Sequence, residues 1–127
     1  MTQHEIDRFK VILQAKQGDA ARILRNREGI VVEKSADELD ETERAVERDI
    51  AIQNLDRESR RLREIRGALR RIDESIFGAC LYCDEDISRK RLEAVPWAPL
   101  CLQCQEAADQ GVERVIETVE VWLVDAA

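Results

Sequence analysis

All four cysteines of this 127-residue chain lie in one stretch near its C-terminal third. They form two Cys-x-x-Cys pairs, Cys80 with Cys83 and Cys101 with Cys104, and seventeen residues separate the pairs. This spacing is typical of a four-cysteine zinc site, because each pair brings two thiolates to one ion and two pairs complete a tetrahedron. Iron is the less expected alternative in a sequence without a redox context. The cysteines therefore predict one bound Zn²⁺ ion.

A zinc ion with four thiolate ligands has no open position for water or substrate, so we expect it to be structural. The occupied site would carry a net negative charge, which Arg89, Lys90 and Arg91 in the intervening loop are placed to offset. His4 is the only histidine and lies near the N-terminus, so no catalytic triad is predicted around it. We therefore predict that the protein is not an enzyme.

Two helical segments precede the cysteines. Residues 3–27 carry an apolar stripe at helical spacing, and Gly29 with the β-branched run 30–32 is expected to end that helix. Ser35 and Asp37 are candidate N-caps of a second helix that runs to about residue 76. Its later apolar residues have the 3-4 spacing of a coiled-coil seam: Leu62, Ile65, Leu69, Ile72 and Ile76. We predict that the two helices pair as an antiparallel hairpin; a parallel dimer of the long helix is the alternative.

After the hairpin, Phe77-Gly78 is expected to end the long helix, and the two prolines at 96 and 99 exclude regular structure before Cys101. A last helix is predicted from about Leu102 to Val124. The predicted fold is all-α: a long antiparallel coiled-coil hairpin (1–77), a small four-cysteine zinc finger (78–106) and a C-terminal helix packed on the base (107–127).

Charge is segregated along the chain. The formal net charge is −7, which argues against non-specific nucleic-acid binding as the main task. Residues 33–49 nevertheless hold eight acids and three bases, and residues 57–71 hold seven bases and two acids. The acids crowd at 33–43, where the hairpin should turn, in greater number than helix stability requires. We interpret this acidic tip as a candidate contact surface.

No signal peptide and no apolar run of ~20 residues is present, so we expect a cytoplasmic protein without a membrane span. In the reducing cytosol, cysteines bind metal rather than form disulfides.

The order of these motifs resembles the DksA/TraR family of four-cysteine zinc-finger transcription regulators. The resemblance covers residues 37–105, over half the chain. It rests on four stretches: Asp37-Glu-Leu-Asp40, Ile76-Phe-Gly-Ala-Cys-Leu-Tyr-Cys83, Ile87-Ser-Arg-Lys-Arg-Leu-Glu-Ala-Val-Pro96 and Cys101-Leu-Gln-Cys104. It implies a bacterial RNA polymerase-binding regulator that inserts its tip through the secondary channel of the enzyme towards the catalytic Mg²⁺.

The resemblance also assigns roles to single residues. Asp37 and Asp40 match the first two positions of the family's tip pattern D-x-x-D-x-A, whereas the third position is Thr42. Asp84 stands where a glycine commonly follows the first cysteine pair. Possible partner contacts are the basic residues Arg57, Arg60, Arg89, Lys90 and Arg91.

The alarmone ppGpp is a partner of longer family members. Basic residues that help bind it there correspond to Glu64, Val95 and Gln105, although Arg57 and Arg60 match. The resemblance therefore implies that synergy with ppGpp is weak or absent.

Two other functions fit the composition. A zinc-finger nucleic-acid-binding protein would use the basic surfaces at 88–91 and 57–71, and a self-associating coiled-coil adaptor would form a dimer. The leading hypothesis is a monomeric regulator that modulates transcription initiation without binding specific DNA sequences.

Overall fold

The structure, a computed structural model, describes the backbone of residues 1–34 and 41–126 and the side chains of residues 1–26 and 41–123. It contains five helices: α1 (Gln3–Lys34), α2 (Glu41–Asp73), α3 (Arg89–Ala94), α4 (Leu102–Asp109) and α5 (Glu113–Ala126). The described residues form no β-strand, only one isolated bridge between Ala79 and Asp86. The all-α fold class is confirmed. None of the described helices has an apolar stretch long enough to cross a membrane.

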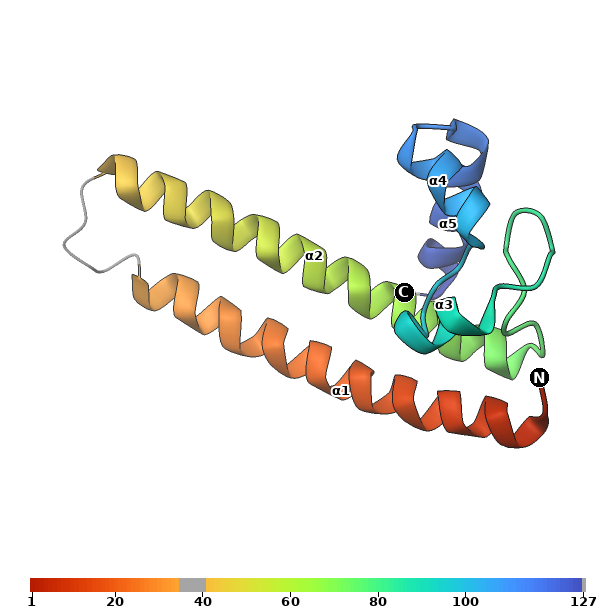
Figure 1. Cartoon of the computed structure of the whole chain (residues 1–127). Helices are drawn as coiled ribbons and strands as arrows, with labels where there is room; N and C mark the ends of the chain where they lie inside the picture. Colours follow the sequence, from red (N-terminus) through yellow and green to blue (C-terminus); the bar gives the residue numbers. More distant parts are fainter. Residues whose placement is uncertain (35–40, 127) are drawn as a thin grey trace.

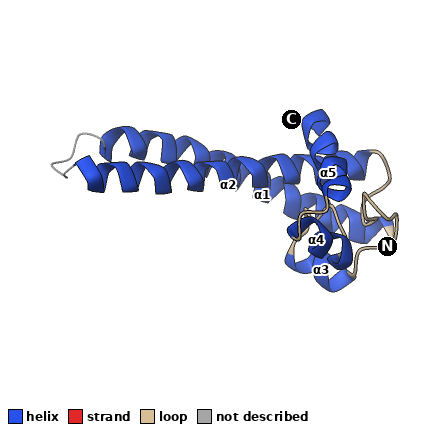
Figure 2. Ribbon diagram, turned by 90° about the horizontal axis from the view of Figure 1, so that it is seen from above, coloured by secondary structure: helices blue, strands red, loops and turns tan. Residues whose placement is uncertain are grey.

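Helices α1 and α2 run antiparallel, side by side, and confirm the predicted hairpin (Figures 1 and 2). At 1.5 Å per residue, each extends for about 50 Å. The end of α1 at this far end differs from the prediction. Helix α1 continues through Gly29 and the β-branched run to Lys34, and α2 begins at Glu41. Gly29 costs about 1 kcal/mol of helix propensity, which a long helix packed along a partner tolerates. The predicted N-caps Ser35 and Asp37 lie outside the described residues.

Among the described side chains, the buried apolar seam of the hairpin lies near its base. Its buried residues are Leu13, Ala20, Leu62, Ile65 and Ala68. Ile76, which the spacing placed in this seam, lies beyond the end of α2 and is 40% exposed. The described side chains at 41–50 are exposed apart from that of Arg44. Packing therefore holds the hairpin mainly in the half next to the finger.

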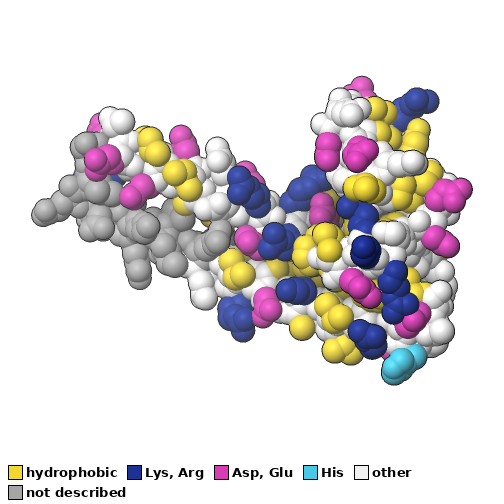
Figure 3. Space-filling view, in the orientation of Figure 1, with side chains coloured by type: hydrophobic (Ala, Val, Ile, Leu, Met, Phe, Trp, Pro, Cys, Tyr) yellow, Lys and Arg dark blue, Asp and Glu magenta, His cyan; other side chains and the backbone are white. Residues whose placement is uncertain are grey.

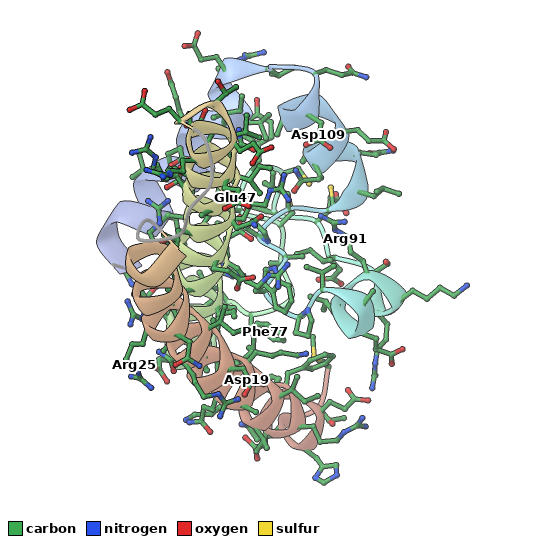
Figure 4. The ribbon with its side chains drawn as sticks, turned by 90° about the vertical axis from the view of Figure 1, so that its left-hand side faces the viewer. Asp19, Arg25, Glu47, Phe77, Arg91 and Asp109 are labelled. Atoms are coloured by element: carbon green, nitrogen blue, oxygen red, sulfur yellow. The ribbon has the colours of Figure 1, made fainter. Side chains whose placement is uncertain are left out.

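A second core joins both ends of the chain at the base. Its buried members come from α1, the finger, α4 and α5: Phe9, Cys80, Ile87, Leu92, Leu100, Cys104, Val115, Val119 and Leu123. Phe77 packs against both cores, and its ring centroid lies 5.4 Å from that of Phe9 (Figure 4). The finger is thus packed directly onto the hairpin.

The C-terminal segment consists of two helices, whereas one helix from Leu102 to Val124 was predicted. Helix α4 ends at Asp109, and Gly111 takes φ of +88°, a left-handed conformation that glycine adopts without steric cost. Helices α4 and α5 fold back on each other and stand across the base of the hairpin, and α5 also contacts α2 (Figure 1). We call this helix pair the arm.

Arg71 is the one buried charged residue among the described side chains, at 1% exposure. Its Nη2 donates long hydrogen bonds to the carbonyls of Trp97, at 3.4 Å, and Ala98, at 3.3 Å. Burial lowers the pKa of Arg71 to about 10, an effect that Glu64 opposes, so the guanidinium stays charged at neutral pH. Arg71 thereby ties α2 to the proline-bounded loop of the finger.

Arg71→Ala should lower the free energy of unfolding by about 2–4 kcal/mol, because it leaves a cavity and two carbonyls without their donor. Denaturant titration followed by circular dichroism measures this change. The matched control is Arg66→Ala on the exposed surface of the same helix, which should stay within about 0.5 kcal/mol of the parent protein. Equal effects of the two changes would contradict the tie.

Candidate metal centre and hairpin tip

The first cysteine pair lies on a tight turn closed by short backbone hydrogen bonds. The N–H of Cys80 donates to the carbonyl of Glu85 at 2.8 Å, and the N–H of Asp84 donates to the carbonyl of Cys80 at 3.1 Å. Asp84 has φ of +63°, the left-handed region that the family's glycine would enter freely. Aspartate tolerates this conformation better than most residues, so the substitution preserves the turn.

The second cysteine pair lies at the start of α4. Cys101 is the N-cap residue, and its carbonyl accepts the N–H of Gln105 at 2.9 Å. The positive end of a helix favours thiolates in its first turn. A hydrogen bond of 2.9 Å from the N–H of Leu81 to the carbonyl of Pro99 ties the two turns together. Each pair is thus fixed locally, and the pairs face each other.

The four Sγ atoms of Cys80, Cys83, Cys101 and Cys104 all lie within 4.8 Å of one another. The sulfurs of Cys83 and Cys101 are 3.8 Å apart. A tetrahedron with Zn–S bonds of about 2.3 Å has edges of about 3.8 Å, so this separation fits a zinc ion. The four cysteines are therefore positioned to bind one metal ion, as predicted, and as a closed set they form a structural site.

The thiols alone do not all ionise. Burial opposes ionisation of Cys80, but the N–H groups of Cys83, Cys101 and Tyr82 together lower its pKa to about 7. Burial raises the pKa of Cys104 far above its ordinary value, and the neighbouring thiols add to that rise. A divalent cation at the centre is what makes four adjacent thiolates stable.

The three bases predicted to offset the charge of the site have different positions. Arg91 donates from Nε to the carbonyl of Leu100 at 2.9 Å, next to Cys101, and from Nη2 to Gln105 at 3.4 Å (Figure 4). Arg89 instead forms an ion pair with Glu5 of α1. Lys90 is exposed. Of the three, only Arg91 makes a hydrogen bond next to a cysteine pair.

The end of α1 and the start of α2, which flank the predicted tip in the sequence, lie at the end of the hairpin opposite the finger (Figure 1). Asp37 and Asp40 lie outside the described residues. Thr42 is exposed in the first turn of α2, between the exposed acids Glu41 and Glu43. The described part of the tip is therefore acidic on both sides of the threonine.

Of the two bases predicted on α2, Arg57 is exposed, whereas Arg60 is held by two carboxylates. Its guanidinium lies 3.2 Å from Glu64 and 3.0 Å from Glu120 of α5. Arg60 and Glu64 line a groove of about 210 Å³ between α2, α4 and α5, together with Pro99, Leu100, Gln105, Ala108, Asp109, Ile116 and Val119. Burial raises the pKa of Glu64, against the opposing charge of Arg60.

Sequence reasoning missed three residues that join the finger, arm and hairpin. Arg71 is one of seven bases between 57 and 71, and no local pattern distinguishes it from its neighbours. Trp122 is one of two tryptophans in the chain, and nothing in the sequence around it indicates its contact with Gly67. Gly67 carried a usable signal, because a lone glycine inside a long helix indicates close approach of another group.

Asp84→Val should weaken zinc binding about 5- to 30-fold, because a β-branched residue at φ of +63° costs about 1–2 kcal/mol. Asp84→Gly should bind zinc at least as tightly as the parent protein. Competition with a chromophoric chelator measures both affinities. Glu85→Val is the control in the same turn without a positive φ, and an equal loss in that variant would contradict the argument.

Comparison with known proteins places these features in a family. A family model described as "Prokaryotic dksA/traR C4-type zinc finger" matches residues 75–110, which confirms the predicted zinc ion. The RNA polymerase-binding transcription factor DksA of Haemophilus influenzae is 31% identical over 119 residues, which cover 91% of this chain and 81% of that protein. The factor of the same name from Escherichia coli K12 is 27% identical over 112 residues, or 86% of this chain and 74% of that protein.

The fold is also similar to a solved structure, that of transcription factor DksA2 from Pseudomonas aeruginosa. The TM-score is 0.74 over 87% of each chain, at 23% sequence identity. The hairpin, the closed cysteine site and the similarity to DksA over most of the chain agree with one another. The chain therefore belongs to the DksA/TraR family of zinc-finger transcription regulators.

Proposed function

We propose that this protein is a non-enzymatic, monomeric regulator that binds RNA polymerase in the cytoplasm and inserts its hairpin through the secondary channel. Its tip, with Asp37 and Asp40, would then modulate initiation near the catalytic site. The curated relatives, named RNA polymerase-binding transcription factors, support the partner. The observation that carries the proposal is the hairpin itself, whose tip is about 50 Å from the finger.

Electrostatics gives the tip a means of action without catalysis. Carboxylates change the local potential strongly in a narrow channel with low-dielectric walls, where they act on metal ions and nucleotide phosphates. Glu41 and Glu43 add to the charge of the two aspartates at the start of α2. The cysteine site, in contrast, has no position for a substrate, so its role is to hold the base.

The nucleic-acid-binding alternative is less well supported, because most of its bases already have partners within the chain. Arg60, Arg61, Arg70 and Arg89 pair with glutamates, and Arg71 is buried. On the face shown in Figure 3, Lys and Arg alternate with Asp and Glu over the drawn side chains rather than forming a continuous basic patch. A partner that follows phosphates needs such a patch.

Asp40→Asn should abolish the effect of the protein on transcription initiation while leaving its affinity for core RNA polymerase and its zinc content unchanged. The reason is that the change removes charge at the tip and nothing at the base. In vitro transcription and a pull-down with core RNA polymerase measure the two properties.

Asp49→Asn is the matched control, since it removes the same charge from an exposed position farther along α2. It should leave transcription unchanged. A fully active Asp40→Asn variant would exclude the tip. Failure to bind polymerase, combined with salt-sensitive binding to free DNA, would support the nucleic-acid alternative instead.

Response to ppGpp should be weak or absent. Glu64 and Gln105 both line the groove beside Arg60, whose charge is already shared by two carboxylates. A polyphosphate brought there would meet carboxylates instead of free cations. Binding of labelled ppGpp to polymerase should therefore be the same with and without this protein. Glu64→Lys combined with Gln105→Lys should add binding that requires the protein. Tight, protein-dependent binding with the parent chain would contradict this expectation.

A further inference from the structure

The arm is attached to the rest of the molecule through the core of the base and at two further places. Helix α4 begins at the zinc ligands, with Cys101 as its N-cap and Cys104 in its first turn. Helix α5 contacts α2 near the C-terminal end of α5, through Trp122. Between these attachments the chain reverses at Gly111. The metal thus fixes one side of the arm, and contacts of α5 with α2 fix the other.

The second attachment is a close fit between one indole and one glycine. The Nε1–H of Trp122 donates to the carbonyl of Gly67 at 3.4 Å. A Cβ added at Gly67 would lie 3.2 Å from Nε1 and 3.3 Å from Cδ1 of Trp122. Both distances are shorter than those that Cβ atoms usually keep from their neighbours. The guanidinium of Arg70 covers the ring at 4.6 Å from its centroid, and Arg60, two turns before Gly67 on α2, pairs with Glu120. We call this contact the Trp122 seat.

The seat is separate from the packing that keeps α5 folded. Val115, Val119 and Leu123 form the buried stripe of α5 in the core of the base, and Trp122 lies beside that stripe. Trp122 is only partly buried and is in neither core. Loss of the seat therefore removes one contact between α5 and α2 and leaves these three core residues in place.

We propose that Gly67 and Trp122 are positioning residues for RNA polymerase binding, because the seat holds the arm at the angle at which arm and hairpin contact the enzyme together. This inference rests on the function proposed above. When only a fraction of molecules has the competent arrangement, the apparent dissociation constant rises in inverse proportion to that fraction. A rigid seat keeps the competent fraction high.

Gly67→Leu tests the proposal, since its side chain needs the space that the indole occupies. Leucine has a higher helix propensity than glycine, so α2 itself is not weakened. Gly18→Leu is the matched control, because an added Cβ there meets nothing within 4 Å. Trp122→Ala removes the seat from the other side. Zinc content and far-ultraviolet circular dichroism confirm that each variant is folded.

The arm angle is measured by electron–electron resonance between spin labels on non-canonical amino acids. Exposed Gln14 of α1 and exposed Glu106 of α4 are suitable positions. Gly67→Leu and Trp122→Ala should broaden and shift the distance distribution, and Gly18→Leu should not. If about a tenth of the molecules keep the competent angle, affinity for core RNA polymerase should fall about tenfold in the two seat variants.

Rescue separates positioning from a general structural effect. Trp122→Phe in the Gly67→Ala background gives the added methyl group room, so this pair should bind polymerase more tightly than Gly67→Ala alone. Unchanged distances in Gly67→Leu would overturn the seat, and changed distances with parental affinity would overturn its role in binding. If the parent chain does not bind polymerase, the proposed function fails, and with it the role in binding, whereas the distances still decide whether the seat sets the arm.

Discussion

Four sulfur atoms from two turns hold together a finger that has little regular secondary structure of its own. Between α2 and the arm, the chain has a single six-residue helix, α3, and one isolated β-bridge. A segment this short cannot bury enough apolar surface to fold alone. Cys80 and Cys104 are nevertheless buried in the same core as Phe9 and Leu123, so the metal centre lies inside the packing of the base. The binding free energy of the ion is therefore part of the folding free energy of the whole base.

The hairpin is firm at the base and loosely packed farther out. Among the described side chains, the outermost fully buried apolar residues are Ala20 on α1 and Leu62 on α2, while Val46, Ile50 and Ile52 are each more than half exposed. Regions with few buried contacts open locally at low free energy. The outer half of α2 is thus a region of lower local stability carried by a rigid base. This distribution would suit the channel insertion proposed above, in which the hairpin has to adapt to the surrounding walls.

The accuracy of the sequence predictions follows the range of the interactions involved. The cysteine spacing predicts the metal site because each pair is closed by hydrogen bonds within its own turn. The antiparallel hairpin follows from a seam that one helix cannot bury alone. The burial of Arg71 depends on carbonyls 26 and 27 residues away, and the pairing of Arg60 depends on Glu120, 60 residues away. The break at Gly111 was visible as a glycine, but only the packing of α5 on α2 shows that the chain must turn there.

The packing of Phe9 in one core with Val115, Val119 and Leu123 has a consequence for synthesis of the chain. Helices α1 and α2 can pair as soon as both have left the ribosome. The ring of Phe9 can meet Phe77 early, but the core around it is complete only when residue 123 has emerged, because its members span almost the entire chain. Contacts of such long sequence separation form late and slow the folding of a small protein. The nascent chain therefore exposes an incomplete base until α5 has emerged, whereas the four cysteines are all available to a metal ion once residue 104 has left the ribosome.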